Sequence, residues 1–396
     1  MLFSMPTMNA YELKVIEDVE KVRDALKYSL SALPRWNGLL RRTTLARNIQ
    51  GSNSIEGYSV TVEDAIAAIE AEEPLEAQSE AWMAVSGYRG AMTYVLQLAD
   101  DPHFSYNEGF LRSLHFMMLS YDLAKRPGRW RPGPIYVREE ATGRTVYEGP
   151  PAENIPELVR ELIDQLNTKE GSPIVRAAMA HLNFVMIHPF SDGNGRMARC
   201  LQTLVLARQG IIEPWFCSIE EYLGRNTQPY YGVLAKVGQG GWHPENDARP
   251  WLHFCLTAHF RQANTLLRRS KEMRKMWDEM ENLVQRRGLP DRVIFALADA
   301  AIGFRVRNAT YRRAADITDT LASRDLKLLV DAGLISARGE KKGRVYVAAQ
   351  PLREIREKTR EPRALDDPSF GPTPYFPGLE PKPETSTTAF LRSLSQ

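Results

Sequence analysis

The residues from His188 to Arg199 combine several groups that can do chemistry within one short segment. The segment reads His-Pro-Phe-Ser-Asp-Gly-Asn-Gly-Arg-Met-Ala-Arg and contains an imidazole, a carboxylate, two glycines and two guanidinium groups. Two glycines at the start of a helix allow several backbone N–H groups to face one anion, and the helix dipole adds to the attraction. Gly193-Asn194-Gly195 has this layout, which is typical of phosphate binding.

The side chains around these glycines suit the transfer of a phosphate-bearing group. Arg196 and Arg199 are three residues apart in the first turn of the following helix, so both can point the same way and bind successive phosphates. Asp192 has a side chain short enough to hold Mg²⁺ together with phosphate oxygens. His188, at the end of the preceding helix, is placed to take a proton from an attacking hydroxyl. Together these residues predict phosphoryl or nucleotidyl transfer.

Two familiar phosphate motifs do not fit this segment. A Walker loop needs Lys-Ser/Thr after its last glycine, whereas Arg196 follows Gly195. A dinucleotide fingerprint needs a preceding strand and a third glycine, whereas a helical pattern precedes His188. A plain helix-loop-helix corner with a structural histidine would explain a lone His or a lone Gly-x-Gly, but the complete segment favours phosphate chemistry.

The segment resembles the signature of Fic-domain proteins, His-Pro-Phe-x-(Asp/Glu)-Gly-Asn-Gly-Arg-x-x-Arg, and matches it at every fixed position. The resemblance implies transfer of AMP from ATP to a Tyr, Ser or Thr hydroxyl of a target protein, with Mg²⁺ and release of pyrophosphate. It also implies a mostly α-helical Fic fold with a small β-hairpin flap.

The family's pattern assigns a role to each chemical group of the segment. By this resemblance His188 is the general base and Asp192 is the magnesium ligand. Gly193, Asn194 and Gly195 bind the α- and β-phosphates. Arg196 and Arg199 bind the outer phosphates. Phe190 is expected to be a buried anchor.

The resemblance extends to two segments outside the signature. A hairpin from Ile135 to Tyr147 stands where the family keeps its flap, which binds the target's backbone as an added strand. Arg225, Tyr230 and Tyr231 resemble the family's segment that closes over the adenine side of the nucleotide. Two tyrosines in a helix are also common in a core.

An earlier segment, Ser52-Asn53-Ser54-Ile55-Glu56-Gly57, matches the family's inhibitory motif, (Ser/Thr)-x-x-x-Glu-(Gly/Asn). Ser52 and Glu56 are four residues apart and share a helix face, and Gly57 is a natural residue for a helix C-terminus. A carboxylate from Glu56 that pairs with Arg199 would remove the cation that the γ-phosphate needs. An ordinary glycine-capped helix end is the alternative. We expect autoinhibition by Glu56.

The elements that must position these residues are mainly helices, because apolar residues recur every three or four positions along most of the chain. A strongly apolar helix over 174–187 leads into His188, and an apolar stripe continues from Met197 to Val205, so two buried helices should bracket the loop. Further helices are expected over 10–33, 39–56, 61–74, 106–123, 155–167 and 251–287. The helix at Thr61 has Asp64 in a capping-box position.

The chain divides into five predicted parts. These are an N-terminal helical region with the inhibitory motif (1–110), the Fic catalytic core (111–258), a connecting helix (259–290), a winged helix-turn-helix (291–350) and a proline-rich tail (351–396). The fourth part follows from the order helix, helix, helix, hairpin.

The fourth part carries a local basic surface, which comprises Arg324, Lys327, Lys341, Lys342 and Arg344. Such a surface permits DNA binding, but Asp325 and Asp331 dilute the charge of the candidate recognition helix. A packing or dimerisation surface is therefore preferred.

The overall composition sets limits on the function. The chain has 396 residues with 51 Lys and Arg against 49 Asp and Glu, a net charge of +2, which argues against a chain-wide polyanion binder. Cys200, Cys217 and Cys255 lack metal-type spacing and suit buried thiols in a reducing compartment. With neither a leader nor a membrane-spanning segment expected, the predicted location is cytoplasmic.

The expected substrates are ATP, Mg²⁺ and a target protein with an exposed hydroxyl side chain. Whether the chain is its own target and whether it forms a homodimer are left open. Two alternatives also stay open. One is a DNA-binding regulator whose Fic site senses nucleotide. The other is a Fic enzyme of different chemistry, such as removal of AMP with Glu56 aligning water, or transfer of another phosphate group.

Overall fold

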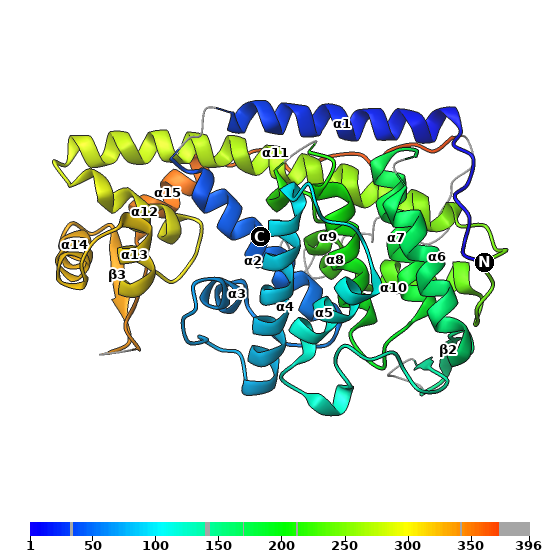
Figure 1. The fold of residues 1–396 in the computed structure, drawn as a ribbon. Helices are drawn as coiled ribbons and strands as arrows, with labels where there is room; N and C mark the ends of the chain where they lie inside the picture. The colour runs from blue at the N-terminus through cyan, green and yellow to red at the C-terminus, as the bar shows by residue number, and fades with distance from the viewer. Residues whose placement is uncertain (32–34, 139–142, 169, 211–212, 341–342, 372–396) are drawn as a thin grey trace, which may run out of the picture.

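The computed structural model describes residues 1–31, 35–138, 143–168, 170–210, 213–340 and 343–371, and most of them lie in α-helices (Figure 1). The first half contains α1 (Ala10–Leu30), α2 (Asn37–Ile55), α3 (Val62–Ile69), α4 (Ser79–Gln97), α5 (Glu108–Leu119), β1 (Tyr136–Arg138), β2 (Thr145–Glu148), α6 (Ile155–Asn167) and α7 (Pro173–Ile187). The second half contains α8 (Asn194–Ala207), α9 (Glu220–Arg225), α10 (Thr227–Gly238), α11 (Arg249–Arg286), α12 (Ile294–Ala301), α13 (Asn308–Ala315), α14 (Asp319–Asp331), β3 (Ile335–Arg338), β4 (Val345–Ala348) and α15 (Gln350–Lys358).

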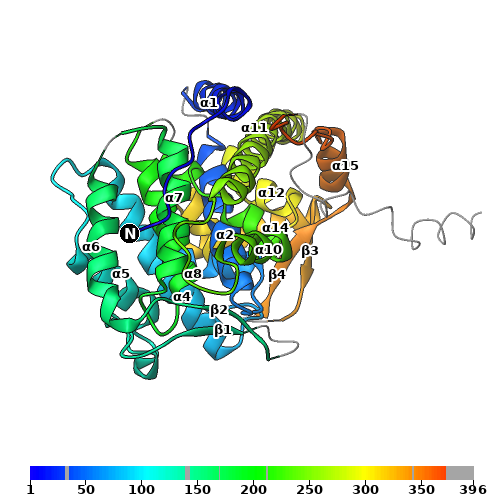
Figure 2. The same ribbon diagram turned by 90° about the vertical axis from the view of Figure 1, so that its right-hand side faces the viewer.

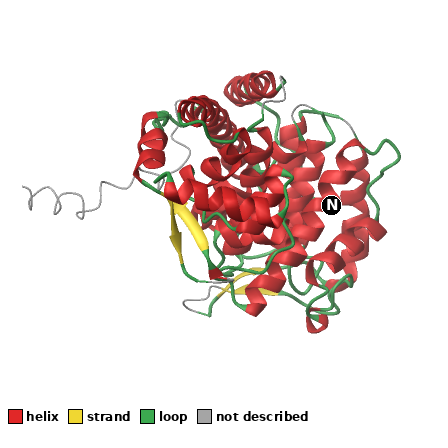
Figure 3. Ribbon diagram, turned by 90° about the vertical axis from the view of Figure 1, so that its left-hand side faces the viewer, coloured by secondary structure: helices red, strands yellow, loops and turns green. Residues whose placement is uncertain are grey.

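The predicted fold class is confirmed, since the described residues are mostly helical and include two short antiparallel hairpins (Figure 3). β1 pairs with β2 with Val137 opposite Tyr147, and β3 pairs with β4. Figure 2 shows the β1–β2 hairpin along the lower edge of the helical body, beneath α8. None of the helices in the described part of the chain is both long and apolar enough to cross a membrane.

The glycine loop, residues 188–195, joins α7 to α8, and these two helices pack against each other. Nearly every side chain of both helices is buried, including Phe184 and Leu201, which are fully buried. Burial of both helices holds the loop on a rigid base because closely packed side chains resist displacement. The predicted pair of buried helices around the loop is therefore confirmed.

Two local sequence signals gave the expected helix ends. Thr61 Oγ1 accepts from the backbone N–H of Asp64 at 3.0 Å, and Asp64 Oδ2 accepts from the backbone N–H of Thr61 at 3.1 Å, which completes the capping box of α3. α2 ends at Ile55, and Gly57 follows with φ +83°, a conformation that glycine adopts at little cost. Glu56 therefore stands at the end of α2.

α11 is a single long helix that runs beside α1 along one edge of the molecule (Figure 1). Its first turns are buried in the helical body, and its last turns carry α12. The helix expected over 251–287 is therefore present as one uninterrupted helix, and the boundary predicted at residue 259 between core and connecting helix falls inside it.

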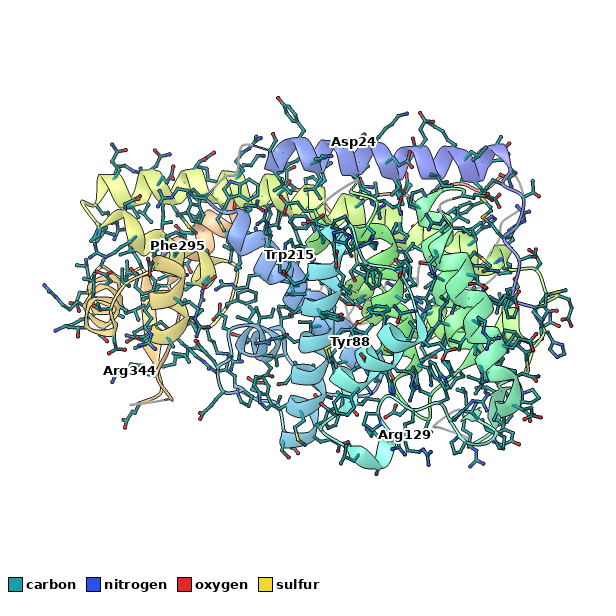
Figure 4. All side chains as sticks on the ribbon, viewed as in Figure 1. Asp24, Tyr88, Arg129, Trp215, Phe295 and Arg344 are labelled. Atoms are coloured by element: carbon teal, nitrogen blue, oxygen red, sulfur yellow. The ribbon has the colours of Figure 1, made fainter. Side chains whose placement is uncertain are left out.

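Residues 291–349 contain α12, α13, α14, β3 and β4 in the order that the sequence predicted, and we call them the C-terminal module. Ion pairs fix the module against α2 and α3. Arg305 binds Glu63 at 2.6 Å, and Arg42 of α2 pairs with Glu70 at 2.8 Å and with Asp299 of α12. Figure 4 shows Arg344 at the outer tip of the β3–β4 hairpin, away from the helical body.

One argument against DNA binding, that Asp325 dilutes the positive charge of the candidate recognition helix, is wrong. Asp325 is buried, and Arg292 and Tyr311 bind its carboxylate, with Arg292 Nε at 2.7 Å from Asp325 Oδ2. It therefore adds no charge to the exposed face of α14, where Arg324 and Lys327 lie. The role of the basic surface stays a prediction, and Lys341 and Lys342 lie outside the described residues.

The prediction of a proline-rich tail over 351–396 is wrong for its first residues, which form a helix, and residues 372–396 lie outside the described part of the chain. Residues 350–358 form α15, and Leu352 is fully buried against the preceding elements. Further along, the ring of Phe370 stacks on His253 of α11 with centroids 4.1 Å apart. Proline at the second position of α15 is compatible with the start of a helix, and packing stabilises the helix that follows.

Candidate active site

His188 ends α7 in the left-handed conformation, with φ 51° and ψ 57°. Its Nδ1 lies 3.0 Å from the carbonyl oxygen of Val185, and because a carbonyl can only accept, Nδ1 carries the proton. Nε2 therefore keeps its lone pair. Burial lowers the pKa of His188, and the charge of Arg131 lowers it further, so the ring is neutral at neutral pH. A neutral imidazole with a free Nε2 is able to act as a base.

Asn194 fixes the shape of the glycine loop. Its Oδ1 accepts from the backbone N–H of Phe190 at 2.9 Å, and its Nδ2 donates to the carbonyl of Phe190 at 2.9 Å. Both bonds close the loop on itself, so the side chain of Asn194 contributes shape. Gly193 has φ +77°, and a Cβ at Gly195 would lie 2.7 Å from Glu56 Oε1. The second glycine therefore makes room for a carboxylate at the loop.

Phe190 is fully buried, as expected for an anchor, and its ring stacks on His115 of α5 with centroids 3.6 Å apart. Gly128 donates its backbone N–H to His115 Nδ1 at 2.8 Å, so Nε2 carries the proton and donates to the carbonyl of Asp192 at 2.9 Å. Burial lowers the pKa of His115 to about 4, which keeps this neutral tautomer. The sequence reasoning missed His115, since no motif marks it.

Asp192 lies between two cations. Its Oδ2 is 3.1 Å from Lys125 Nζ, and its Oδ1 is 3.7 Å from a terminal nitrogen of Arg196 and accepts from the N–H of Gly193 at 2.6 Å. Burial raises the pKa of Asp192, but the charges of Arg196 and Lys125 outweigh burial, so the net pKa is lowered. Asp192 is therefore ionised.

The side chains of Arg196 and Arg199 are each 1% exposed, although both are charged. Arg199 donates Nε to Ser52 Oγ at 2.7 Å, and one of its terminal nitrogens donates to Glu56 Oε1 at 2.7 Å. Burial lowers the pKa of Arg199, but Glu56 more than compensates, and the net pKa is raised. The predicted pairing of Glu56 with Arg199 is therefore present, and Ser52 supports it.

Several N–H groups of these arginines have no hydrogen-bond partner within the described residues. They are Nε and Nη1 of Arg196 and Nη1 of Arg199, and each is buried. An unsatisfied buried donor costs about 1–3 kcal/mol, so several of them together indicate that water or an anion binds them. The donors lie in the first turns of α8, where the helix dipole also attracts anions. The arrangement is complementary to a phosphate group.

The two tyrosines assigned to nucleotide binding lie in different surroundings. Tyr230 is buried, and its hydroxyl is 3.0 Å from His181 Nε2. Tyr231 is half exposed, and its hydroxyl donates to the carbonyl of Ile55 at 3.0 Å, at the end of α2. Arg225 pairs with Glu221 at 2.6 Å and is exposed. Their contact with the nucleotide stays a prediction.

The hairpin expected as the flap is attached to the end of α7 and the base residue through two side chains. The hydroxyl of Tyr147 donates to the carbonyl of Met186 at 2.6 Å, in the last turn of α7. Arg131 donates Nε to the carbonyl of His188 at 2.8 Å and also binds the carbonyl of Pro150 after β2. The sequence reasoning did not single out Arg131. It links the strand region directly to the backbone of His188.

The described residues include no group of three or more His, Cys, Asp or Glu side chains that could hold a metal. Asp192 is the carboxylate next to the unpaired donors of Arg196. Mg²⁺ in proteins often binds one or two carboxylates together with substrate phosphates and water. The donor set at Asp192 therefore fits a magnesium ion that arrives with phosphates, and it does not fit a cage of protein ligands alone.

Comparison with known proteins gives a consistent family. Residues 105–206 match the model of the Fic/DOC family, which overlaps the predicted core of 111–258. The chain is 28% identical over 256 residues to a Caenorhabditis elegans protein named protein adenylyltransferase fic-1, covering 63% of this chain and 46% of the relative. A protein adenylyltransferase Fic from Nematostella vectensis is 26% identical over 258 residues, covering 63% and 55%. The chain thus spans about half the length of the curated relatives it matches.

Solved structures show the same fold. A Fic family protein from Desulfovibrio desulfuricans superposes with a TM-score of 0.57 at 23% identity and covers 87% of this chain and 98% of its own. A Fic domain containing signaling protein from Bacteroides thetaiotaomicron gives a TM-score of 0.53 at 22% identity and covers 64% and 97%. Residues 105–206 therefore match the Fic/DOC family model, and the described residues have the fold of solved Fic proteins.

Proposed function

We propose that this chain transfers AMP from ATP to a Tyr, Ser or Thr hydroxyl of a target protein, itself included. One observation carries the proposal: buried, unpaired N–H groups of Arg196 and Arg199 lie in the first turns of α8, just after the loop that begins with the neutral base His188. Phosphate oxygens would accept hydrogen bonds from these donors, and His188 would take the proton from the attacking hydroxyl. The names of the relatives, protein adenylyltransferase, support the same reaction.

The proposed step needs one base and a departing pyrophosphate. His188 Nε2 accepts the proton of the target hydroxyl as the hydroxyl oxygen bonds to the α-phosphorus. The bond between the α-phosphorus and the bridging oxygen breaks, and pyrophosphate leaves with the electron pair. The backbone N–H groups of the glycine loop and Arg196 stabilise the negative charge that develops.

Asp192 would hold Mg²⁺ together with the phosphates. The ion would supply positive charge that neutralises phosphate oxygens. The protein's own contribution is to keep Asp192 ionised and oriented. The charges of Arg196 and Lys125 keep the carboxylate ionised, the N–H of Gly193 binds its Oδ1, and His115 holds the backbone carbonyl of Asp192.

Regulation by Glu56 is part of the proposal. Glu56 binds Arg199 at 2.7 Å inside the site, Ser52 also binds Arg199, and Gly195 leaves room for the carboxylate. A γ-phosphate would need the same guanidinium group. Glu56 and the γ-phosphate therefore compete, and the chain is held in a restrained state until Glu56 moves.

Mass spectrometry after incubation with ATP and Mg²⁺ tests the reaction. We expect Glu56→Gly to add AMP to itself or to a protein of a cell lysate at least about tenfold faster than the unmodified chain, because Arg199 is released. Glu56→Gly/His188→Ala is the matched control, since it keeps the freed arginine and lacks the base.

Two results would overturn the proposal. One is an added mass of phosphate in place of AMP on the Glu56→Gly reaction. The other is equal AMP transfer with and without His188. If Glu56→Gly transfers AMP no faster than the unmodified chain, the regulatory part fails alone.

A further inference from the structure

A lysine outside the sequence motif reaches the candidate active site. Lys125 ends the short 3₁₀ helix η2 (Leu123–Lys125), which follows α5 and precedes the hairpin. Its Nζ lies 3.1 Å from Asp192 Oδ2 and donates to the hydroxyl of Tyr58 at 3.1 Å. Its side chain is 22% exposed, so the ammonium group lies at the edge of the site and not on the open surface.

The carboxylate of Asp192 faces a second cation besides Lys125. Arg196 also faces Asp192, with a separation of 3.7 Å, so a single carboxylate faces two positive groups. Arg199 has its own partner in Glu56. When Glu56 is withdrawn, three cations face one carboxylate. This excess of positive charge suits a triphosphate, which remains negative even with a bound divalent cation.

The partner of Lys125 is the group that the proposed function assigns to Mg²⁺. An ammonium group and a divalent cation cannot both use Asp192 at close range without repulsion. When Asp192 turns to the metal, Lys125 loses its anion and must find another nearby. The phosphate oxygens bound by Arg196 are the anions within reach of the same carboxylate.

Tyr58 covers this lysine in the present conformation. Besides accepting the hydrogen bond from Lys125, its ring lies 5.9 Å from Lys125 Nζ and 5.5 Å from the guanidinium carbon of Arg196. Tyr58 is two residues after Glu56 on the same turn, and its N–H donates to the carbonyl of Asn53. A movement of this turn would therefore uncover Lys125, Arg196 and Arg199 together.

We propose that Lys125 is a further binding residue for the triphosphate of ATP, which pairs with Asp192 while the site is closed by Glu56 and Tyr58. The inference rests on the proposed function in that it takes ATP as the nucleotide. It adds a third cation, supplied by η2, to the two that the motif supplies. Lys125 contributes affinity for the phosphates beyond the first, and none for adenosine.

Calorimetric titration of ATP and AMP with Mg²⁺ present, so that Asp192 binds the metal and releases Lys125, tests this in the Glu56→Gly/His188→Ala background, which lacks the base and so leaves ATP intact. Lys125→Met should raise the Kd of ATP at least about tenfold, as expected for loss of a charge-assisted hydrogen bond, and should change the Kd of AMP less than about twofold. Lys125→Arg should keep the ATP value within about threefold. Lys27→Met, which removes an exposed lysine of α1, should change neither.

The ratio of the Kd values of ATP and AMP is the deciding measurement, because partial unfolding would weaken the binding of both nucleotides equally. An unchanged ATP-to-AMP ratio in Lys125→Met overturns the inference. This outcome is independent of the proposed reaction. If Glu56→Gly failed to transfer AMP but the titrations showed the Lys125-dependent ratio, the inference would stand and the reaction would fall.

Discussion

At the scale of single residues, the chemistry of the site depends on groups that support the motif from outside. His188 is a base because the carbonyl of Val185 binds the proton on Nδ1 and because burial keeps the ring neutral. Asp192 is oriented by His115, which is itself held by the backbone of Gly128. Loss of such a support would move a reactive atom without removing it.

The protonation of His188 gives a prediction about pH. Its pKa is lowered below the ordinary 6.5, so the neutral, basic form persists to lower pH than for a free histidine. We expect the kcat/KM of Glu56→Gly for AMP transfer to stay constant from pH 8 down to about 6.5 and to fall only below that, since kcat/KM follows the free enzyme's base. Removal of Glu56 shifts the pKa in the same direction, because its charge raises the pKa of His188.

Pyrophosphate release measured at saturating Mg²⁺ checks this profile, because metal binding suppresses protonation of the nucleotide. A fall with its midpoint above 6.5 would contradict the prediction. Circular dichroism at each pH serves as the control for acid unfolding.

At the scale of elements, the site is a corner between α7 and α8 with three further elements attached to it. The end of α2 brings Ser52 and Glu56 to Arg199, η2 brings Lys125 to Asp192, and the β1–β2 hairpin is bound to the end of α7. Each attachment uses a side chain that reaches a backbone carbonyl or a charged group. The position of the hairpin relative to the base therefore depends on a few identifiable contacts.

The contact of Tyr147 with Met186 gives a prediction for the hairpin. Tyr147→Phe keeps the buried ring but leaves the carbonyl of Met186 without this donor, so we expect a loss of about 1–2 kcal/mol in stability. Because the hairpin is expected to bind the target's backbone, the KM for the protein target should rise while the Kd of ATP stays unchanged.

Thermal unfolding and steady-state kinetics with the identified target measure the two effects. Tyr136→Phe is the matched control, since Tyr136 lies on the neighbouring strand with an exposed side chain. Equal effects of the two substitutions would show that the hydrogen bond to Met186 does not hold the hairpin.

At the scale of the whole molecule, the C-terminal module is joined to the Fic region by more than a covalent linker. α11 extends as one helix from the buried body to its end beside α12, and α15 returns to pack beside it. Arg305 binds Glu63 and Glu76, and Arg42 of α2 bridges Glu70 and Asp299. α2 therefore contacts the module near its first turns and the active site at its last turn.

These ion pairs give a prediction about the module. Arg305→Gln should weaken its attachment by about 1–2 kcal/mol, because the pair with Glu63 is partly buried and bidentate. Hydrogen exchange of peptides from α12 to α14 should then be about 5- to 30-fold faster. Arg312→Gln removes an exposed pair with Asp319 at 3.7 Å and should leave exchange unchanged within about twofold. Unchanged exchange in Arg305→Gln would contradict the proposed attachment.

The sequence by itself determined the local features. Periodicity gave the helices, Thr61 and Asp64 gave the start of α3, and the His188–Arg199 segment identified the loop and its family. The sequence pattern did not predict α15, because the prolines after residue 361 led to a predicted tail that began at residue 351. Burial of Leu352 stabilises this helix. Local sequence signals indicate which secondary structure a segment prefers, and a strong motif identifies functional residues within its own segment.

Only the tertiary structure decided which distant groups meet outside the two motifs. The resemblance predicted that Glu56 pairs with Arg199, 143 residues away, whereas Lys125 and Asp192 are brought together by η2 and the glycine loop, which share no pattern in the sequence. The burial of Asp325, the buried unpaired N–H groups and the tautomers of His188 and His115 likewise follow from packing. Charge pairing and desolvation depend on distance in space, and sequence spacing carries no measure of that distance beyond a few helical turns.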